Sequence, residues 1–157
     1  GTDRKGVKQL VNSIKEALGK KYDFLENKTI EKYNIYPILL VHDEIFNAAG
    51  LNYLLNKWYQ AELLQKGITN PRIKPLTVIT IDTLIIYKKL FKTKKLRFKQ
   101  ILDLYATKHL SIVDDKKLKM KKLIPISQFI FDYVKANKIN NELDNLEDVV
   151  ASISNLN

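Results

Sequence analysis

The sequence predicts an α/β fold with a small, mainly parallel sheet flanked by helices and a helical C-terminal extension. Two short apolar runs, 35–42 and 76–81, are each followed by apolar side chains at helical spacing, and the rest of the chain shows only helical patterns. The 157 residues are the size of one domain. We therefore treat 1–157 as a single domain, with an α/β layer over 1–92 and a helical part over 93–157.

The first helix is expected over residues 4–19. Asp3 is a suitable N-cap residue, and Gly19 marks the end of the pattern. The apolar side chains at helical spacing are Val7, Leu10, Val11, Ile14 and Leu18. Because this helix begins so near the first residue, we expect the chain to be a fragment of a larger protein. Residues 22–34 are ambiguous: they fit a short strand or an irregular connection followed by a helical turn, and they are treated as a loop.

The first predicted strand, residues 35–42, is almost uniformly apolar, which is typical of a strand buried on both faces. A helix that ends at Gly67 follows it. The apolar positions of this helix are Leu51, Leu54, Leu55, Trp58, Tyr59, Leu63 and Leu64. Residues 76–81 form the second predicted strand, and the long connection allows the two strands to run parallel. Asp82 is expected to cap the next helix, residues 83–91.

Three further helices are expected in the C-terminal part, over residues 96–109, 125–137 and 143–153. The second of them opens with Pro125, a residue that suits the first turn of a helix. Residues 114–122 form a charged stretch between helices. No internal repeat or low-complexity linker divides the chain, which supports a single domain.

The charge of the chain is positive and clustered. Lys and Arg number 27 against 17 Asp and Glu, a formal net charge of +10, and residues 72–122 hold fifteen basic side chains against four acidic ones. Such a cluster attracts nucleic-acid phosphates or anionic membranes. The alternative is that codon composition enriches solvated faces in lysine. Only three of the basic residues are Arg, which disfavours readout of bases but not contact with the backbone.

The residues expected to contact nucleic acid lie in two Lys-rich stretches. The first stretch supplies Lys88, Lys89, Lys92, Lys94, Lys95, Arg97 and Lys99, and the second supplies Lys119, Lys121 and Lys122. Phe91 and Phe98 interleave with the cations of the first stretch. Exposed rings among cations can stack on bases, whereas the same rings at helical spacing would face the core. Both interpretations are open at this point.

Acidic residues after both predicted strands form a second candidate site. Asp43 and Glu44 follow the first strand, and Asp82 follows the second. Because the carboxyl ends of parallel strands lie at one edge of a sheet, these carboxylates could converge, bind Mg²⁺ and support phosphoryl transfer. The competing interpretation is that the Asp residues cap helices. His42 is either a general base or, more commonly for a lone His at a strand end, a half-buried residue hydrogen-bonded to a carbonyl.

Several kinds of site are excluded or disfavoured by composition. The chain has no Cys and only two His, which argues against disulfides and Cys- or His-rich metal sites. His109 is expected to interact with a helix C-terminus. The five Gly form neither a phosphate-binding loop nor a nucleophile elbow. We expect no resident metal or cofactor, with Mg²⁺ needed only if the strand-end carboxylates form an enzyme site. No apolar run is long enough to cross a bilayer.

Four segments occur in an order that points to a known family. They are the helix GVKQLVNSIKEAL at 6–18, the strand IYPILLVHDEIF at 35–46, the helix AGLNYLLNKWY at 49–59 and the strand LTVITIDTL at 76–84. This order, over about residues 4–92, resembles the second half of restriction-endonuclease-like proteins of the PD-(D/E)XK superfamily. Their catalytic Asp and E-x-K motif lie on strands before the helix that would correspond to 6–18.

The only E-x-K triplet that follows an Asp in this region is Glu26-Asn27-Lys28, after Asp23. The spacing leaves no room for the usual strand-turn-strand between Asp and Glu, so no catalytic residue is carried over from the family. The resemblance implies a nuclease-like fragment without its active site. Such a fragment would bind nucleic acid, or support the rest of the protein, without cleaving nucleic acid.

These observations lead to one expected function and two alternatives. We expect an accessory or C-terminal domain of a bacterial, cytoplasmic, nuclease-like protein that contacts nucleic-acid backbone without base specificity. The first alternative is a metal-dependent phosphotransfer-type enzyme that uses the strand-end carboxylates. The second is a protein-interaction or dimerisation module that uses the helices over 125–137 and 143–153, with a second copy or the missing N-terminal domain as partner. No membrane partner is expected.

Overall fold

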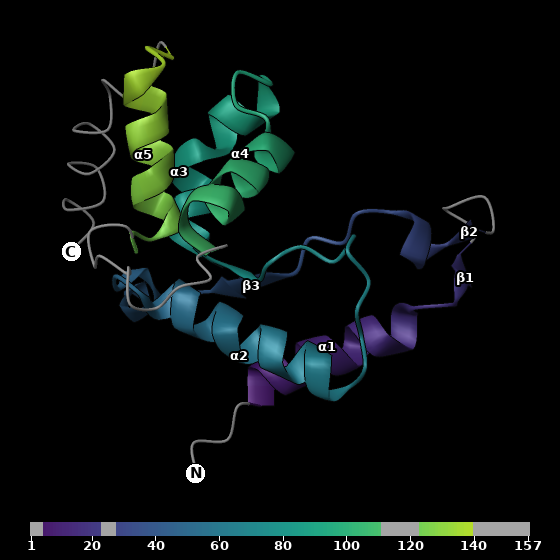
Figure 1. The fold of residues 1–157 in the computed structure, drawn as a ribbon. Coiled ribbons are helices and arrows are strands. Elements are labelled where there is room, and N and C mark those ends of the chain that lie inside the picture. Colours follow the sequence, from purple (N-terminus) through teal and green to yellow (C-terminus); the bar gives the residue numbers. More distant parts are fainter. Residues whose placement is uncertain (1–4, 23–27, 111–122, 140–157) are drawn as a thin grey trace.

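The computed structural model describes residues 5–22, 28–110 and 123–139, and it confirms the predicted α/β fold. A two-stranded parallel sheet lies between two layers of helices (Figure 1). The strands are β3 (Ile38–Val41) and β4 (Thr77–Thr80). One layer holds α1 (Lys5–Ala17) and α2 (Leu51–Gln65), and the other holds α3 (Ile81–Lys92), α4 (Phe98–Tyr105) and α5 (Ile126–Ala136).

The two layers have separate hydrophobic clusters because successive strand residues point to opposite faces of a sheet. Val78 and Leu76 pack with α1 and α2 in a cluster that also contains Val11 and Tyr59. Ile79 packs on the other face with buried side chains of α3, α4 and α5. The sheet therefore links two cores, and every residue of β4 is buried.

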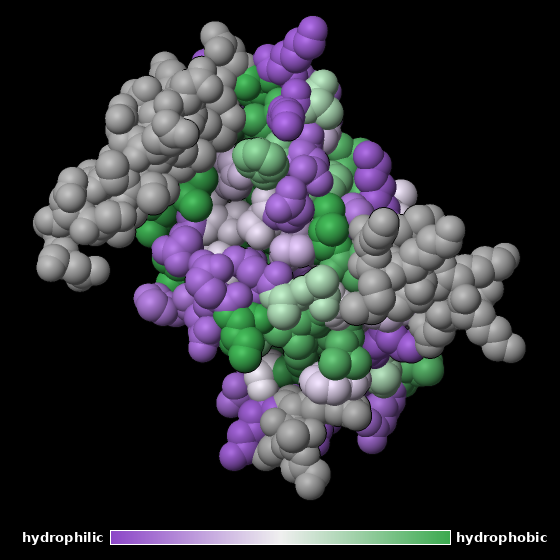
Figure 2. Space-filling model, turned by 90° about the vertical axis from the view of Figure 1, so that its left-hand side faces the viewer, coloured by the Kyte–Doolittle hydropathy of each residue, from purple (hydrophilic) through white to green (hydrophobic). Residues whose placement is uncertain are grey.

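The parallel pairing of the two predicted strands is confirmed. Ile38 pairs with Thr77 and Val41 with Thr80, and a single bridge joins Ile35 to Ile73 before the strands begin. The prediction that the first strand is buried on both faces is wrong, because Leu40 is 52% exposed. Within the described residues β3 has only β4 as a neighbour, so β3 is an edge strand. Figure 2 shows hydrophobic and hydrophilic residues side by side on one face of the molecule.

The free edge of β4 is covered by two asparagine side chains of α2. The Asn52 side chain donates to the Leu76 carbonyl (2.9 Å) and accepts from the Val78 N–H (3.0 Å). The Asn56 side chain accepts from the Leu76 N–H at 2.8 Å. These contacts satisfy strand groups that a third strand would otherwise pair. Both asparagines are buried, at 5% and 4% exposure.

The first helix ends at Ala17, two residues before the predicted end. The predicted loop after it contains a short antiparallel pair, β1 (Lys21–Tyr22) with β2 (Lys28–Thr29), followed by the 3₁₀ turn η2 (Ile30–Lys32). Pairings of two residues are too short to produce a recognisable alternation in the sequence, which explains why this region was expected to be irregular.

The cap of α3 differs from the prediction. Thr80 is the N-cap residue, and its hydroxyl accepts from the Thr83 N–H at 3.3 Å. Asp82 lies in the first turn of the helix, where a negative charge is favourable but makes no cap bond. Threonine and aspartate are both good N-cap residues, so the sequence could not decide between Thr80 and Asp82. The strand ends at Thr80, and this makes Thr80 the cap.

The C-terminal helices are fixed to the rest of the fold by hydrogen bonds that precede α5. α4 continues into the π-helical turn η4 (Ala106–Leu110), and α5 opens after Pro125 as predicted. The Gly50 N–H donates to the Leu123 carbonyl (2.8 Å), and the Tyr105 hydroxyl donates to the Ile124 carbonyl (2.9 Å). Gly50 has a φ of +85°, which favours glycine.

Tyr59 carries a buried hydroxyl that has no hydrogen-bond partner among the described residues. The side chain is fully buried, and burial raises the pKa of its hydroxyl. Because an unpaired buried hydroxyl costs about 1–3 kcal/mol, Tyr59→Phe is expected to leave the free energy of unfolding unchanged or to raise it by about 1 kcal/mol.

Urea denaturation followed by circular dichroism measures this effect. The matched control is Tyr105→Phe, which removes the hydroxyl bonded to the Ile124 carbonyl and is expected to lower the free energy of unfolding by about 1–2 kcal/mol. A larger loss in the Tyr59 variant than in the Tyr105 variant would show that the Tyr59 hydroxyl has a partner.

Three predicted features lie outside the described residues. They are the N-cap Asp3, the charged stretch 114–122, with Lys119, Lys121 and Lys122, and the short helix over 143–153. Among the helices that are described, none combines the length and apolar character needed to span a bilayer.

Candidate nucleic-acid interface

The first Lys-rich stretch forms a tight turn between α3 and α4. The Thr93 hydroxyl donates to the Lys89 carbonyl at 2.9 Å, and Lys94 adopts a positive φ of 58°. The Leu96 N–H then donates to the Leu90 carbonyl at 3.1 Å. Leu96 is only 2% exposed, so its burial holds the turn against the core. The backbone between the two helices is therefore fixed by hydrogen bonds and by packing.

All seven predicted cations of this stretch are exposed at the turn, and we call them together the basic corner. Its members are Lys88, Lys89, Lys92, Lys94, Lys95, Arg97 and Lys99. No acidic residue interrupts the chain between 88 and 102. All seven cations are exposed in the structure, from the second half of α3 to the first turn of α4.

Helix stability explains part of this set but not all of it. Lys89 and Lys92 lie in the last turn of α3, where cations interact favourably with the helix dipole. Arg97 and Lys99 instead lie at the N-terminus of α4, which has no acidic residue in its first turn. Cations are unfavourable at that end of a helix, and bound anions are favourable. The helix dipole therefore does not explain the cations at the start of α4.

The two phenylalanines of the stretch belong to the core. The rings of Phe91 and Phe98 contact each other edge to face, with centroids 5.1 Å apart, and both pack against the cluster of α3, α4 and α5. The core interpretation of these side chains is confirmed. Their rings are therefore engaged with each other and with the core instead of standing free as platforms for bases.

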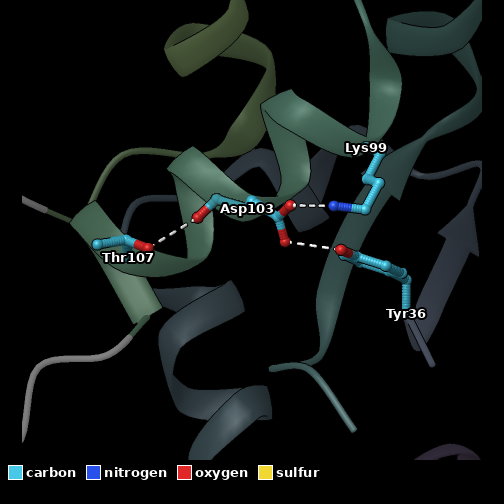
Figure 3. A network of polar contacts seen from close by, with 4 residues as sticks. All are labelled: Tyr36, Lys99, Asp103 and Thr107. Atoms are coloured by element: carbon cyan, nitrogen blue, oxygen red, sulfur yellow. Dashed lines mark hydrogen bonds and ion pairs between the residues drawn. The ribbon is translucent and has the colours of Figure 1, made fainter. Parts of the chain in front are cut away.

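A polar network borders the basic corner (Figure 3). The Asp103 carboxylate accepts one hydrogen bond from the Tyr36 hydroxyl and one from the Lys99 ammonium, each at 2.8 Å. The Thr107 hydroxyl donates to the Asp103 backbone carbonyl at 2.9 Å. The Lys99 nitrogen also lies 5.7 Å from the centre of the Tyr36 ring. The network ties α4 to the segment that leads into β3.

The protonation of this network follows from its neighbours. Burial disfavours the ionised form of Asp103, but Lys99, Tyr36 and the charge of Lys74 outweigh it, so the pKa of Asp103 lies below its ordinary value. The pKa of Lys99 is raised, chiefly by its hydrogen bond to Asp103. The pKa of Tyr36 is raised by burial and then by the same carboxylate. At neutral pH an ionised carboxylate therefore lies among cations.

Sequence reasoning missed Tyr36, Lys74 and Asp103 as neighbours of the basic corner. They come together because residues 35 and 73 form a β-bridge and the Lys74 N–H donates to the Ile35 carbonyl at 2.9 Å. No local motif signals this bridge. The sequence does place two cations, Arg72 and Lys74, shortly before the predicted strand 76–81. This was the signal that could have pointed to Lys74 as part of a basic surface.

The strand-end carboxylates lie at the start of helical elements. Asp43 caps the 3₁₀ turn η3 (Glu44–Asn47) by accepting from the Ile45 N–H at 2.9 Å, which confirms the cap interpretation for this residue. Glu44 accepts from the Asn47 side chain at 2.6 Å. Asp82 lies at the corresponding end of β4, but the described residues contain no group of three or more side chains able to hold a metal ion.

His42 differs from its expected surroundings, whereas His109 lies in the last turn of a helical element, the expected place. His42 is exposed and not half-buried. His109 lies in η4 and packs between aromatic rings, with centroids 5.3 Å from Tyr105 and 5.4 Å from Phe129.

Comparisons with protein-family models, with curated proteins and with solved structures give no match to this chain. The likeness to the second half of PD-(D/E)XK proteins therefore stays a prediction that rests on the order of the elements.

Proposed function

We propose that this chain binds the phosphate backbone of nucleic acid through the basic corner, without reading base sequence. The observation that carries the proposal is the cluster of seven exposed cations on a fixed turn that no acidic residue interrupts. Cations of this density release counterions from a polyanion when they bind it, which supplies affinity. A single exposed lysine contributes only one such contact, so the clustering matters more than the net charge.

The chemistry of the corner supports backbone contact over base readout. Six of its seven members are Lys, which binds phosphate as a point charge, and only Arg97 has the planar fork that reads guanine. Phe91 and Phe98 are engaged with the core, so they supply no stacking for single strands. Duplex backbone is therefore the ligand that fits best.

The role within a larger, nuclease-like protein is part of the same proposal. The support for this role is the order of elements over residues 4–92. No catalytic residue of the family is assigned in this chain. An accessory domain that adds backbone affinity to a neighbouring catalytic domain needs only the basic corner.

Fluorescence anisotropy of a labelled duplex tests the proposal. A variant with Lys92, Lys94, Lys95 and Arg97 each changed to Gln is expected to bind roughly 100-fold more weakly at about 50 mM salt. The slope of log affinity against log salt is expected to fall by about 3 to 4, because four phosphate contacts are removed.

The control removes the same charge from the opposite layer. Lys8, Lys15, Lys20 and Lys66 are exposed on or next to α1 and α2, and their change to Gln should alter affinity far less. Equal losses in the two variants would show a general charge effect without a site. An unchanged salt slope in the corner variant would overturn the proposal.

A further inference from the structure

Lys99, a member of the basic corner, forms an ion pair with the acidic side chain of Asp103. Its ammonium donates to Asp103 at 2.8 Å, one helical turn along α4, although its side chain remains 66% exposed. The second oxygen of the same carboxylate accepts from Tyr36. The bond from Tyr36, which lies on a different segment, orients the carboxylate toward Lys99 instead of leaving it free to turn into solvent.

Lys99 is expected to interact about equally well with the Asp103 carboxylate and with a phosphate. An exposed ion pair of this kind contributes little to stability, because water screens it and two side chains must be held in place. A phosphate that arrives at the corner offers Lys99 an equivalent charge-assisted hydrogen bond. The ammonium can therefore move from Asp103 to a phosphate with little change in free energy.

The charge of Asp103 also acts on the approach of the ligand. Asp103 is the first acidic residue after the uninterrupted basic run, and the charge of Lys74 reaches it as well. A carboxylate at the edge of a phosphate-binding surface repels phosphates and lowers the effective charge of nearby cations.

We propose that Asp103 is an internal competitor of phosphate at the basic corner, which holds Lys99 in the free protein and limits the affinity for nucleic-acid backbone. This inference rests on the proposed function and assigns to that surface a residue that weakens it. Tyr36 is a positioning residue in this arrangement, since it touches the carboxylate and not the ligand.

A double-mutant cycle measured by duplex anisotropy tests this role. Asp103→Asn keeps the shape of the side chain and removes its charge, and it is expected to tighten binding roughly 3- to 10-fold and to steepen the salt slope by about one. Lys99→Gln alone should change affinity less than about twofold, because Asp103 already engages this cation. In the double variant most of the gain from Asp103→Asn should be lost.

Two controls separate position from net charge and from folding. Glu16→Gln on α1 makes the same charge change in the other layer and should leave affinity nearly unchanged. Tyr36→Phe keeps the carboxylate charge and should not reproduce the gain. If Asp103→Asn unfolds more easily by circular dichroism, Asp103→Ser provides a second neutral variant for the same titration.

The outcomes distinguish the two proposals. If the Gln variant of Lys92, Lys94, Lys95 and Arg97 loses binding while Asp103→Asn matches Glu16→Gln, the proposed function stands and the competitor role is overturned. A gain from Asp103→Asn that persists fully with Lys99→Gln would also overturn it. Absence of binding by wild type and Asp103→Asn alike, at the lowest salt, would overturn both proposals.

Discussion

Replacing Asn52 with Ala is expected to lower the free energy of unfolding by about 2–4 kcal/mol. The side chain is 5% exposed and bonds two backbone groups of the strand edge, the Leu76 carbonyl and the Val78 N–H. Both groups lie in buried surroundings, and their loss of partners costs more than the bonds themselves contribute. Urea denaturation followed by circular dichroism measures the change.

The matched control is Asn12→Ala on the exposed face of α1. It makes the same change in a helix without removing a buried bond, and it should be neutral or slightly stabilising because Ala is the better helix former. A loss below about 1 kcal/mol for Asn52→Ala would mean that water or a rearranged neighbour satisfies the strand edge.

The variant Asn52→Asp tests the same contact through pH. The new carboxylate would face the Leu76 carbonyl in a buried site, so its pKa in the folded protein should be higher than in the unfolded chain. A raised carboxyl pKa means that the folded state binds the proton more tightly. The free energy of unfolding of this variant, relative to wild type, should therefore rise as pH falls from neutral toward about 4.

Ile101→Ala is expected to lower the free energy of unfolding by about 2–5 kcal/mol. Ile101 lies on α4 at 0% exposure, in the cluster that joins α3, α4 and α5 to one face of the sheet. Truncation removes its transfer free energy and leaves a cavity that a packed helix layer fills only in part. Thermal and urea denaturation of the purified chain measure the loss.

The control for this prediction is Ile85→Ala, the same substitution on α3 at 63% exposure. It should change the free energy of unfolding by less than about 0.5 kcal/mol. Comparable losses at the two positions would contradict the assignment of Ile85 to the surface and of Ile101 to the core.

Periodicity predicted the existence of the elements better than their surroundings. The apolar runs located both parallel strands, and the spacing of apolar residues located all five α-helices within a few residues. It failed to identify the buried face of α2. Leu64 was expected to be buried but is 72% exposed, whereas Asn52 and Asn56 are buried. Hydrophobic spacing assumes that a buried neighbour is apolar, and here the neighbour is the backbone edge of a strand.

For the candidate site, too, the sequence predicted some residues and missed others. The cations of the basic corner follow one another in the chain, so composition alone could locate them. The Tyr36–Asp103 contact spans 67 residues and depends on the bridge between 35 and 73, which leaves no local pattern. The competing carboxylate could therefore be recognised only after the fold was known.

The asparagine contacts of α2 have a geometric consequence for how the two elements can slide. Asn52 and Asn56 are four residues apart, a rise of about 6 Å along a helix, and they meet strand groups that repeat every two residues, about 6.6 Å. Since the amides bind main-chain atoms, side-chain changes in β4 leave these bonds in place. An insertion of one residue between 76 and 78 would still present main-chain groups to the amides, but it would turn every later side chain of β4 to the other face of the sheet, so chain length in this segment should be far less tolerant of change than its composition.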